Sequence, residues 1–134
     1  MYCSIEDIVK RLSEKELIIL SSESGEQIDE TVVNTAIEDA GDIIDSYLKK
    51  AYALPLETVP KIILKIATEL AIIYLNDKNT QNDESIEVRR KNVFTLLDKI
   101  AKKEIVLNLP AADEEAQTKK ILYSTKKRLF KRGF

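Results

Sequence analysis

The sequence contains no histidine and one cysteine, Cys3. The lack of histidine excludes Ser-His-Asp and Cys-His catalytic sites and removes the commonest zinc ligand. A single cysteine cannot form an internal disulfide or a thiolate pair, a usage typical of a reducing compartment. The three glycines, Gly25, Gly41 and Gly133, are too far apart for a phosphate-binding loop. We therefore expect a protein that is not an enzyme and that holds no cofactor or metal.

Proline, glycine and long hydrophobic runs are also scarce. Three prolines and three glycines are too few for the many tight turns of an all-β sandwich. Lys65 and Glu69 interrupt the most apolar stretch, so no membrane span is expected. The first residues lack the basic and apolar regions of a signal peptide, which predicts a product made in the cytoplasm. The 134 residues, 44% hydrophobic and 33% charged, suit one soluble, helix-rich domain.

The clearest structural signal is a pair of amphipathic segments between Asp29 and Asp77. Apolar residues recur every three or four positions in residues 33–51 and again in residues 62–74. Asp29 is suited to cap the first helix, and Pro55 and Pro60 mark the turn between the two helices. Two amphipathic helices joined by a short turn pack against each other. This helical hairpin is the predicted core.

Shorter signals complete the fold prediction. Ser4 to Asp7 and Ser13 to Glu16 have the spacing of capping boxes and predict two short helices near the N-terminus. A further helix is expected from about Ser85 to Lys103, followed by a short extended segment over residues 105–109. The fold class is therefore all-α, a small helical bundle built on the long hairpin.

Charge divides the chain into two parts. Residues 1–116 hold all 23 acidic residues but only 14 of the 21 basic ones, a net charge of −9, whereas residues 117–134 hold the other seven and no acid. We interpret residues 1–109 as a helical domain and residues 110–134 as an extended basic C-terminal arm that a partner orders.

The arm interleaves basic, aromatic and aliphatic side chains. Its candidate partner-binding residues are Tyr123, Lys126, Lys127, Arg128, Leu129, Phe130, Lys131, Arg132 and Phe134. Aromatic anchors with basic neighbours suit docking in a protein groove, the interpretation we favour. The same composition suits single-stranded nucleic acid, through phosphate contacts and base stacking. A merely solubilising tail is the third alternative.

Three acids, Asp39, Asp42 and Asp45, recur every three residues on the first long helix, so neighbouring pairs face similar directions. They are candidates for a catalytic or metal-binding set, for a solvated acidic face, or for a subunit–subunit contact that meets the basic arm of another copy. Gly41 lies between them in mid-helix, where it predicts the close approach of another backbone.

Tyr47, Tyr52 and Tyr74 fall on or beside the apolar faces of the predicted hairpin. We expect them to be core residues whose hydroxyl groups reach water. Cys3 is expected to behave as a small buried hydrophobic residue.

The order of short motifs in the hairpin and at the C-terminus carries a family resemblance. The motifs are Ala36-Ile37-Glu38-Asp39-Ala40, Ile44-Asp45-Ser46-Tyr47-Leu48, Tyr52-Ala53-Leu54-Pro55-Leu56 and Arg128-x-Phe130-x-Arg132-Gly133-Phe134. Each motif is weak alone, but as a set the chain resembles the head–tail connector (adaptor, or head completion) proteins of Mu-like phages and prophages.

The resemblance implies a non-enzymatic, all-helical virion protein at the capsid vertex. Its copies, about twelve to match the portal, would form a closed ring around the DNA channel. The C-terminal arm would reach the portal protein, and a tail, stopper or tail-terminator protein would dock below. DNA would pass through the ring without sequence-specific binding, and the free protein is expected to be monomeric. The alternative is a small nucleic-acid-binding accessory protein that uses the same arm.

Overall fold

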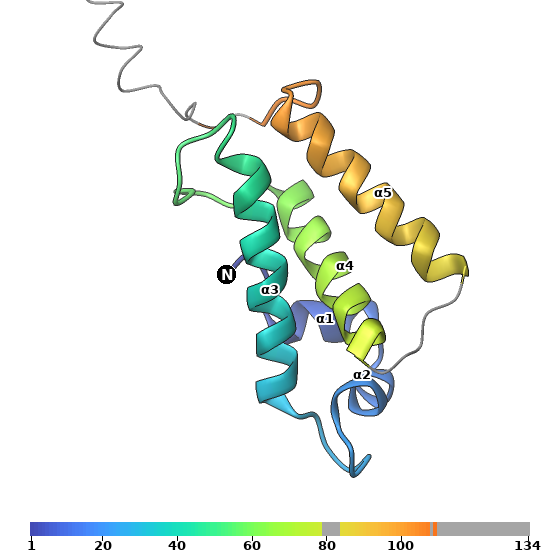
Figure 1. The fold of residues 1–134 in the computed structure, drawn as a ribbon. Helices are drawn as coiled ribbons and strands as arrows, with labels where there is room; N and C mark the ends of the chain where they lie inside the picture. Colours follow the sequence, from blue (N-terminus) through green and yellow to red (C-terminus); the bar gives the residue numbers. More distant parts are fainter. Residues whose placement is uncertain (79–83, 108, 110–134) are drawn as a thin grey trace, which may run out of the picture.

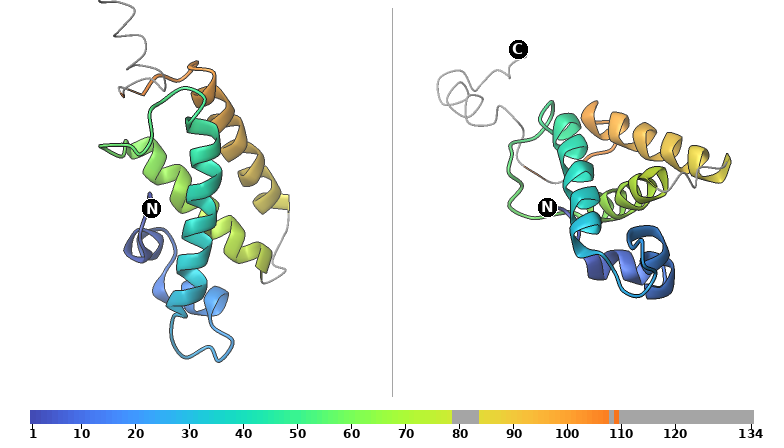
Figure 2. Two further views of the ribbon diagram at one scale, coloured as in Figure 1. Left: turned by 60° about the vertical axis from the view of Figure 1, so that its left-hand side comes forward. Right: turned by 60° about the horizontal axis from the view of Figure 1, so that its bottom comes forward.

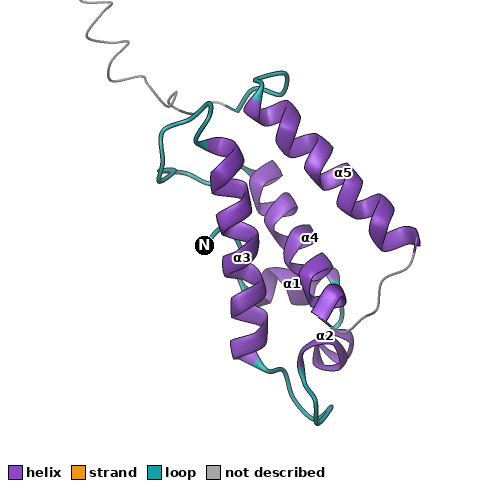
Figure 3. Ribbon diagram, viewed as in Figure 1, coloured by secondary structure: helices purple, strands orange, loops and turns teal. Residues whose placement is uncertain are grey.

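A computed structural model describes residues 1–78, 84–107 and 109 (Figure 1). This part of the chain forms five helices and no strand (Figure 3). The helices are α1 (Ile5–Arg11), α2 (Glu14–Ser21), α3 (Glu30–Leu48), α4 (Lys61–Lys78) and α5 (Glu84–Ala101). The predicted all-α class and the small helical bundle are confirmed.

The predicted helix starts are present with their hydrogen bonds. Ser4 and Asp7 form a reciprocal capping box at α1, where the Ser4 backbone N–H donates to the Asp7 carboxylate at 2.8 Å. The Ser13 hydroxyl accepts from the Glu16 N–H at 3.1 Å, and the Asp29 carboxylate accepts from the Val32 N–H at 3.2 Å. These bonds satisfy backbone donors that have no partner within the helix.

The long helices α3, α4 and α5 pack on one another, with the most extensive contact between α3 and α4 (Figure 1). The short helices α1 and α2 pack against α3 and α4 (Figure 2). Fully buried aliphatic side chains fill the centre, among them Ile8, Leu17, Ile37, Ile44, Ile63, Leu70, Ile73, Leu97 and Ile100. The predicted hairpin is therefore the core, because every other helix packs on at least one of its two members.

The turn after α3 differs in detail from the expectation. The helix ends at Leu48, and the N–H groups of Ala51 and Tyr52 both bond to the Leu48 carbonyl, which closes a tight turn before Pro55. Tyr52 is buried at 3% exposure, and its hydroxyl bonds to the Leu107 N–H rather than reaching water. Tyr47 and Tyr74 are half-buried, and Cys3 is buried as expected.

One local prediction is wrong and another stays a prediction. Residues 105–107 belong to no helix or strand, and residue 108 lies outside the described residues, so the extended segment over residues 105–109 is not tested; the Ile105 N–H bonds back to the Lys99 carbonyl at 3.2 Å, and Leu107 packs in the core. No backbone of another described segment lies close to Gly41. If a Cβ were added to Gly41, the nearest atom outside its own helix would be Cδ2 of the Tyr2 ring, at 3.9 Å. The N-terminal aromatic side chain, which sequence periodicity does not locate, covers this glycine.

No helix in the described ranges is both long enough and apolar enough to cross a membrane. The division into a domain of residues 1–109 and an arm of residues 110–134 stays a prediction.

Candidate functional site

The arm residues predicted to bind a partner lie outside the described residues. This applies to Tyr123, Lys126, Lys127, Arg128, Leu129, Phe130, Lys131, Arg132 and Phe134. The candidate surfaces that the structure does describe are two grooves of opposite charge on the helical body.

The first surface lies along the outer side of α3 and contains two of the three predicted acids. We call it the acidic face; it is lined by Met1, Tyr2, Glu38, Gly41, Asp42, Asp45, Leu54, Pro55, Leu56 and Val59. The α3 residues among these follow the spacing i, i+3, i+4 and i+7, which is one stripe of a helix. The N-terminal residues and the loop before α4 form its other wall.

The acidic face combines carboxylates with exposed apolar groups. Met1 is 70% exposed and Val59 is 38% exposed, although both are large hydrophobic residues. Glu38 and Asp42 are exposed, and neither forms an ion pair within the described part of the chain. Apolar groups bordered by charge are typical of a surface that another macromolecule covers.

Asp45 differs from the other two acids because it has a structural partner. Its carboxylate accepts a hydrogen bond from the Tyr2 hydroxyl, which ties the N-terminal segment to α3. Burial of the Tyr2 ring raises the pKa of its hydroxyl, and the hydrogen bond and negative charge of Asp45 raise it further. Asp45 therefore helps to shape the acidic face.

Asp39 does not line the acidic face with Asp42 and Asp45. It is exposed and lies near Tyr74 of α4, on another flank of α3. Burial raises the pKa of Tyr74, Arg90 opposes the rise, and the charge of Asp39 adds to it. The three acids therefore divide into a pair on one surface and a single residue on another.

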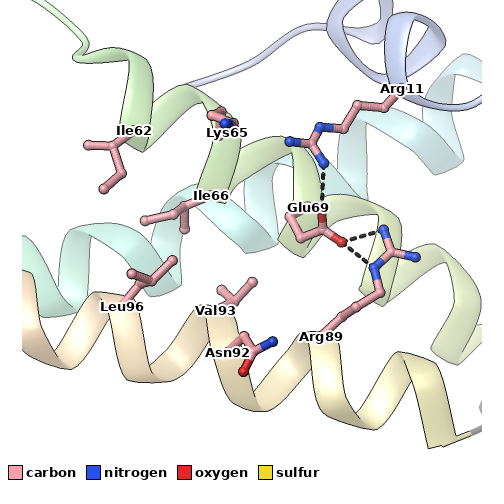
Figure 4. A pocket seen from close by; sticks show the side chains of 9 residues that line it. All are labelled: Arg11, Ile62, Lys65, Ile66, Glu69, Arg89, Asn92, Val93 and Leu96. Atoms are coloured by element: carbon pink, nitrogen blue, oxygen red, sulfur yellow. Dashed lines mark hydrogen bonds and ion pairs between the residues drawn. The ribbon is translucent and has the colours of Figure 1, made fainter.

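The second surface is a groove of about 400 Å³ between α4 and α5, shown in Figure 4. We call it the basic groove; it is lined by Arg11, Ile62, Lys65, Ile66, Glu69, Arg89, Asn92, Val93 and Leu96. Its α4 and α5 residues each follow the spacing i, i+3, i+4 and i+7. Three cationic side chains and one carboxylate give the groove a net positive charge.

Glu69 joins three helices at the rim of this groove. Its carboxylate lies between two guanidinium groups and accepts from Arg11 of α1 at 2.7 Å and from Nε of Arg89 of α5 (Figure 4). The Glu69 side chain is 16% exposed, whereas those of Arg11 and Arg89 are 36% and 39% exposed. The two guanidinium groups carry more N–H donors than one carboxylate can accept, so the rim keeps donors for a further acidic partner.

The floor of the basic groove is apolar. Ile62 and Leu96 are half-buried and remain in contact with solvent, while Ile66 and Val93 lie beneath them. Lys65 is exposed, and no ion pair to it is present within residues 1–78, 84–107 and 109. The groove therefore offers an apolar strip between cationic side chains.

Sequence reasoning found part of the acidic face and none of the basic groove. In the sequence, Glu69 is recognisable only as a charge that interrupts an apolar stretch, and its partners Arg11 and Arg89 lie far from it along the chain. The available signal was the i, i+3, i+4 and i+7 spacing of mixed charged and apolar residues on α4. That pattern indicates a stripe but not which helix lies beside it.

The described residues contain no group of three metal-ligating side chains placed to hold an ion. Both surfaces are open grooves with apolar and charged lining residues. Such surfaces suit contacts with a protein segment or another folded protein.

Comparison with known proteins places the chain among phage proteins. A family model described as "Bacteriophage Mu, Gp36" matches residues 2–123, and residues 124–134 lie beyond that match. The chain is 32% identical over 119 residues to the Mu-like prophage FluMu protein gp36 of Haemophilus influenzae strain Rd, covering 88% of this chain and 83% of that protein. It is 29% identical over 101 residues to Gene product J of Escherichia phage Mu, covering 74% of this chain and 70% of that protein. The chain therefore belongs to the Mu gp36 family of phage and prophage proteins.

Proposed function

We propose that this chain is a structural virion protein, a head–tail connector that forms a ring between the portal and the tail at the capsid vertex. Membership of the Mu gp36 family supports a role in a phage particle. One observation carries the proposal: the chain combines a helical body and a basic C-terminal segment. The body bears two grooves that are charged and partly apolar. In this proposal the protein has no catalytic activity and needs no cofactor.

The C-terminal arm is the portal-binding element in this proposal. Residues 117–134 carry seven basic side chains and no acid, together with Tyr123, Phe130 and Phe134. Aromatic side chains bury a large area when they dock in a pocket, and basic neighbours add contacts at the rim. The acidic body and the basic arm would thus perform separate tasks, ring formation and portal docking.

About twelve copies would surround the DNA channel in a closed ring matched to the portal. A body with net negative charge suits such a channel, because a basic wall would bind phosphates and impede passage of DNA. A tail, stopper or tail-terminator protein would dock on the opposite end of the ring. The free protein would be a monomer that assembles on its partner.

The test is binding of the purified portal, measured by light scattering. The full-length protein should join the portal, whereas a version that ends at Gln117 should not. A full-length variant in which Lys126, Lys127, Arg128, Lys131 and Arg132 are changed to Gln should also lose binding. The matched control changes five exposed lysines of the body to Gln, at positions 10, 15, 49, 61 and 91, and should retain it.

A nucleic-acid-binding accessory protein is the second candidate, and the basic arm is the observation that favours it. If the full-length protein ignores the portal but binds DNA with a steep dependence on salt, this candidate replaces the connector. The same five-residue arm variant should then abolish binding to DNA.

A further inference from the structure

We propose that the basic groove of one copy binds the acidic face of a second copy, in a repeating head-to-tail contact. This inference deepens the proposed function, on which its place in a ring depends, by naming the two surfaces that join neighbouring copies. The two surfaces match each other in charge and in exposed apolar groups, and they occupy separate positions on the body.

The charges of the two surfaces are complementary. Arg11, Lys65 and Arg89 line the basic groove with Glu69 as the lone carboxylate. Three carboxylates and no lysine or arginine line the acidic face. Opposite potentials on facing surfaces favour encounter and fix the register of a contact, while like charges across an interface oppose wrong pairings.

The apolar groups of the two surfaces are also complementary. The basic groove exposes an aliphatic strip that includes Ile62 and Leu96. The acidic face exposes Met1 and Val59, two of the five large hydrophobic residues that are exposed in the described part of the chain. Pairing the surfaces would remove apolar area from water on both sides, at about 25 cal/mol per Å².

A second acidic concavity is a poorer match for the basic groove. It lies in the loop between α2 and α3, where Glu23, Asp29 and Glu30 are accompanied by serines and a glutamine. Ile28 is the one large apolar side chain that lines this concavity. The C-terminal arm, residues 110–134, is also a poorer match, because it is basic overall, with seven Lys and Arg against three acids, Asp113, Glu114 and Glu115. The acidic face therefore fits the groove best.

The two surfaces share no residue and lie on different sides of the body. The acidic face follows α3, whereas the basic groove follows α4 and α5. Figure 4 looks into the basic groove from the side of α4 and α5, with the ribbon of α3 behind them. One copy can therefore use both surfaces at once, and a contact between two different surfaces repeats from copy to copy; it gives a ring where the rotation between neighbours closes, as the proposed function requires.

The test uses concentration-dependent amide shifts of the full-length, isotope-labelled protein, measured by NMR up to about 1 mM, which detects weak association. The amide signals of residues in both surfaces should change position together when the protein is diluted. Lys65→Glu with Asn92→Glu should weaken the association about tenfold or more, as should Glu38→Lys with Asp42→Lys, because each pair places like charges across the contact. A mixture of the two variants should recover it, since the unaltered acidic face of the groove variant meets the unaltered groove of the other variant, and the two altered surfaces are again opposite in charge.

The controls carry the same charge changes at exposed positions outside both surfaces. Gln27→Glu with Lys91→Glu matches the change to the groove, and Glu23→Lys with Glu26→Lys matches the change to the acidic face. Each control should associate as the unaltered protein does. All four altered sites of the test variants are exposed and leave Glu69 and Asp45 with their partners, so the helical amide spectrum should persist.

The inference would be overturned by no shifts at either surface, by shifts at only one of them, by shifts that the charge variants leave unchanged, or by a mixture that does not recover association. Shifts at the acidic face without shifts in the groove would assign the acidic face to the basic arm of another copy. Portal binding is measured separately on the same proteins. If the unaltered protein binds the portal but shows no contact between groove and acidic face, the connector role stands and this contact is rejected. If the two surfaces bind each other but the protein does not bind the portal, the contact stands and the connector role is rejected.

Discussion

The hydroxyl of Tyr52 accepts a hydrogen bond from the backbone N–H of Leu107 at 3.0 Å, and both residues are buried. The bond joins the turn that follows α3 to the segment that follows α5, across 55 positions of the sequence. It therefore holds the start of the C-terminal region against the helical hairpin.

Tyr52→Phe should lower the free energy of unfolding by about 1–3 kcal/mol, because the Leu107 N–H would remain buried without an acceptor. Chemical denaturation monitored by circular dichroism measures the change. Tyr47→Phe is the control: Tyr47 is half-buried and its ring, which packs 6.1 Å from that of Phe94, is retained. Equal stability of the Tyr52→Phe variant and the unaltered protein would show that this bond contributes nothing.

Glu69→Gln should destabilise the fold. In the unaltered protein the Glu69 carboxylate pairs with both Arg11 and Arg89, and without its negative charge the two guanidinium groups would repel each other. The expected loss is about 1–2 kcal/mol, less than for a fully buried pair because both arginines remain partly in water. The loss should shrink as salt is added. The exposed Glu87, which pairs with Arg90 at 3.4 Å, provides the control, and Glu87→Gln should cost less than about 0.5 kcal/mol.

Gly41→Ala should stabilise the protein by about 1 kcal/mol, since alanine is favoured over glycine within a helix. The added Cβ would lie 3.9 Å from the Tyr2 ring, an ordinary van der Waals contact. Thermal unfolding measures the gain. Gly25→Ala should have the opposite effect, because Gly25 has a φ of +75°, where alanine is strained. A destabilised Gly41→Ala protein would mean that Tyr2 cannot accommodate the methyl group.

Stability should fall at high pH through the ionisation of Tyr2. Its pKa is raised in the folded protein by burial and by Asp45, so the folded state holds the phenol proton more tightly than the unfolded chain does. The resulting stabilisation is fully present below the unfolded value of about 10 and is lost as pH rises above it. Above about pH 10, the unfolding free energy of the Tyr2→Phe variant should decline less steeply than that of the unaltered protein. The contributions of the other tyrosines are the same in both proteins and cancel in this comparison. Identical pH profiles would contradict the prediction.

Much of the fold followed from local patterns. Ser4, Ser13 and Asp29 cap helices where their side chains predicted, because a cap depends on residues within one turn. The apolar period located α3 and α4 and the hairpin that they form. The same patterns could not place Tyr2 over Gly41 or Leu107 beside Tyr52, because those contacts join residues far apart in the chain.

The candidate surfaces were predicted less completely. Regular spacing placed three acids on one helix. The groove, however, contains Asp42 and Asp45 but not Asp39, because its other wall is formed by the N-terminal residues and the loop before α4. The basic groove depends on α1, α4 and α5 meeting at Glu69, and no local pattern contains that meeting.

The sequence by itself determined the helical class, the hairpin and the uneven distribution of charge, because caps, apolar periodicity and composition are properties of neighbouring residues. Only the tertiary structure decided which charges share a surface. Packing of α3, α4 and α5 fixes the rotation of each helix through its buried side chains, and that rotation sets where the remaining charged side chains emerge. The acidic face and the basic groove are consequences of that packing.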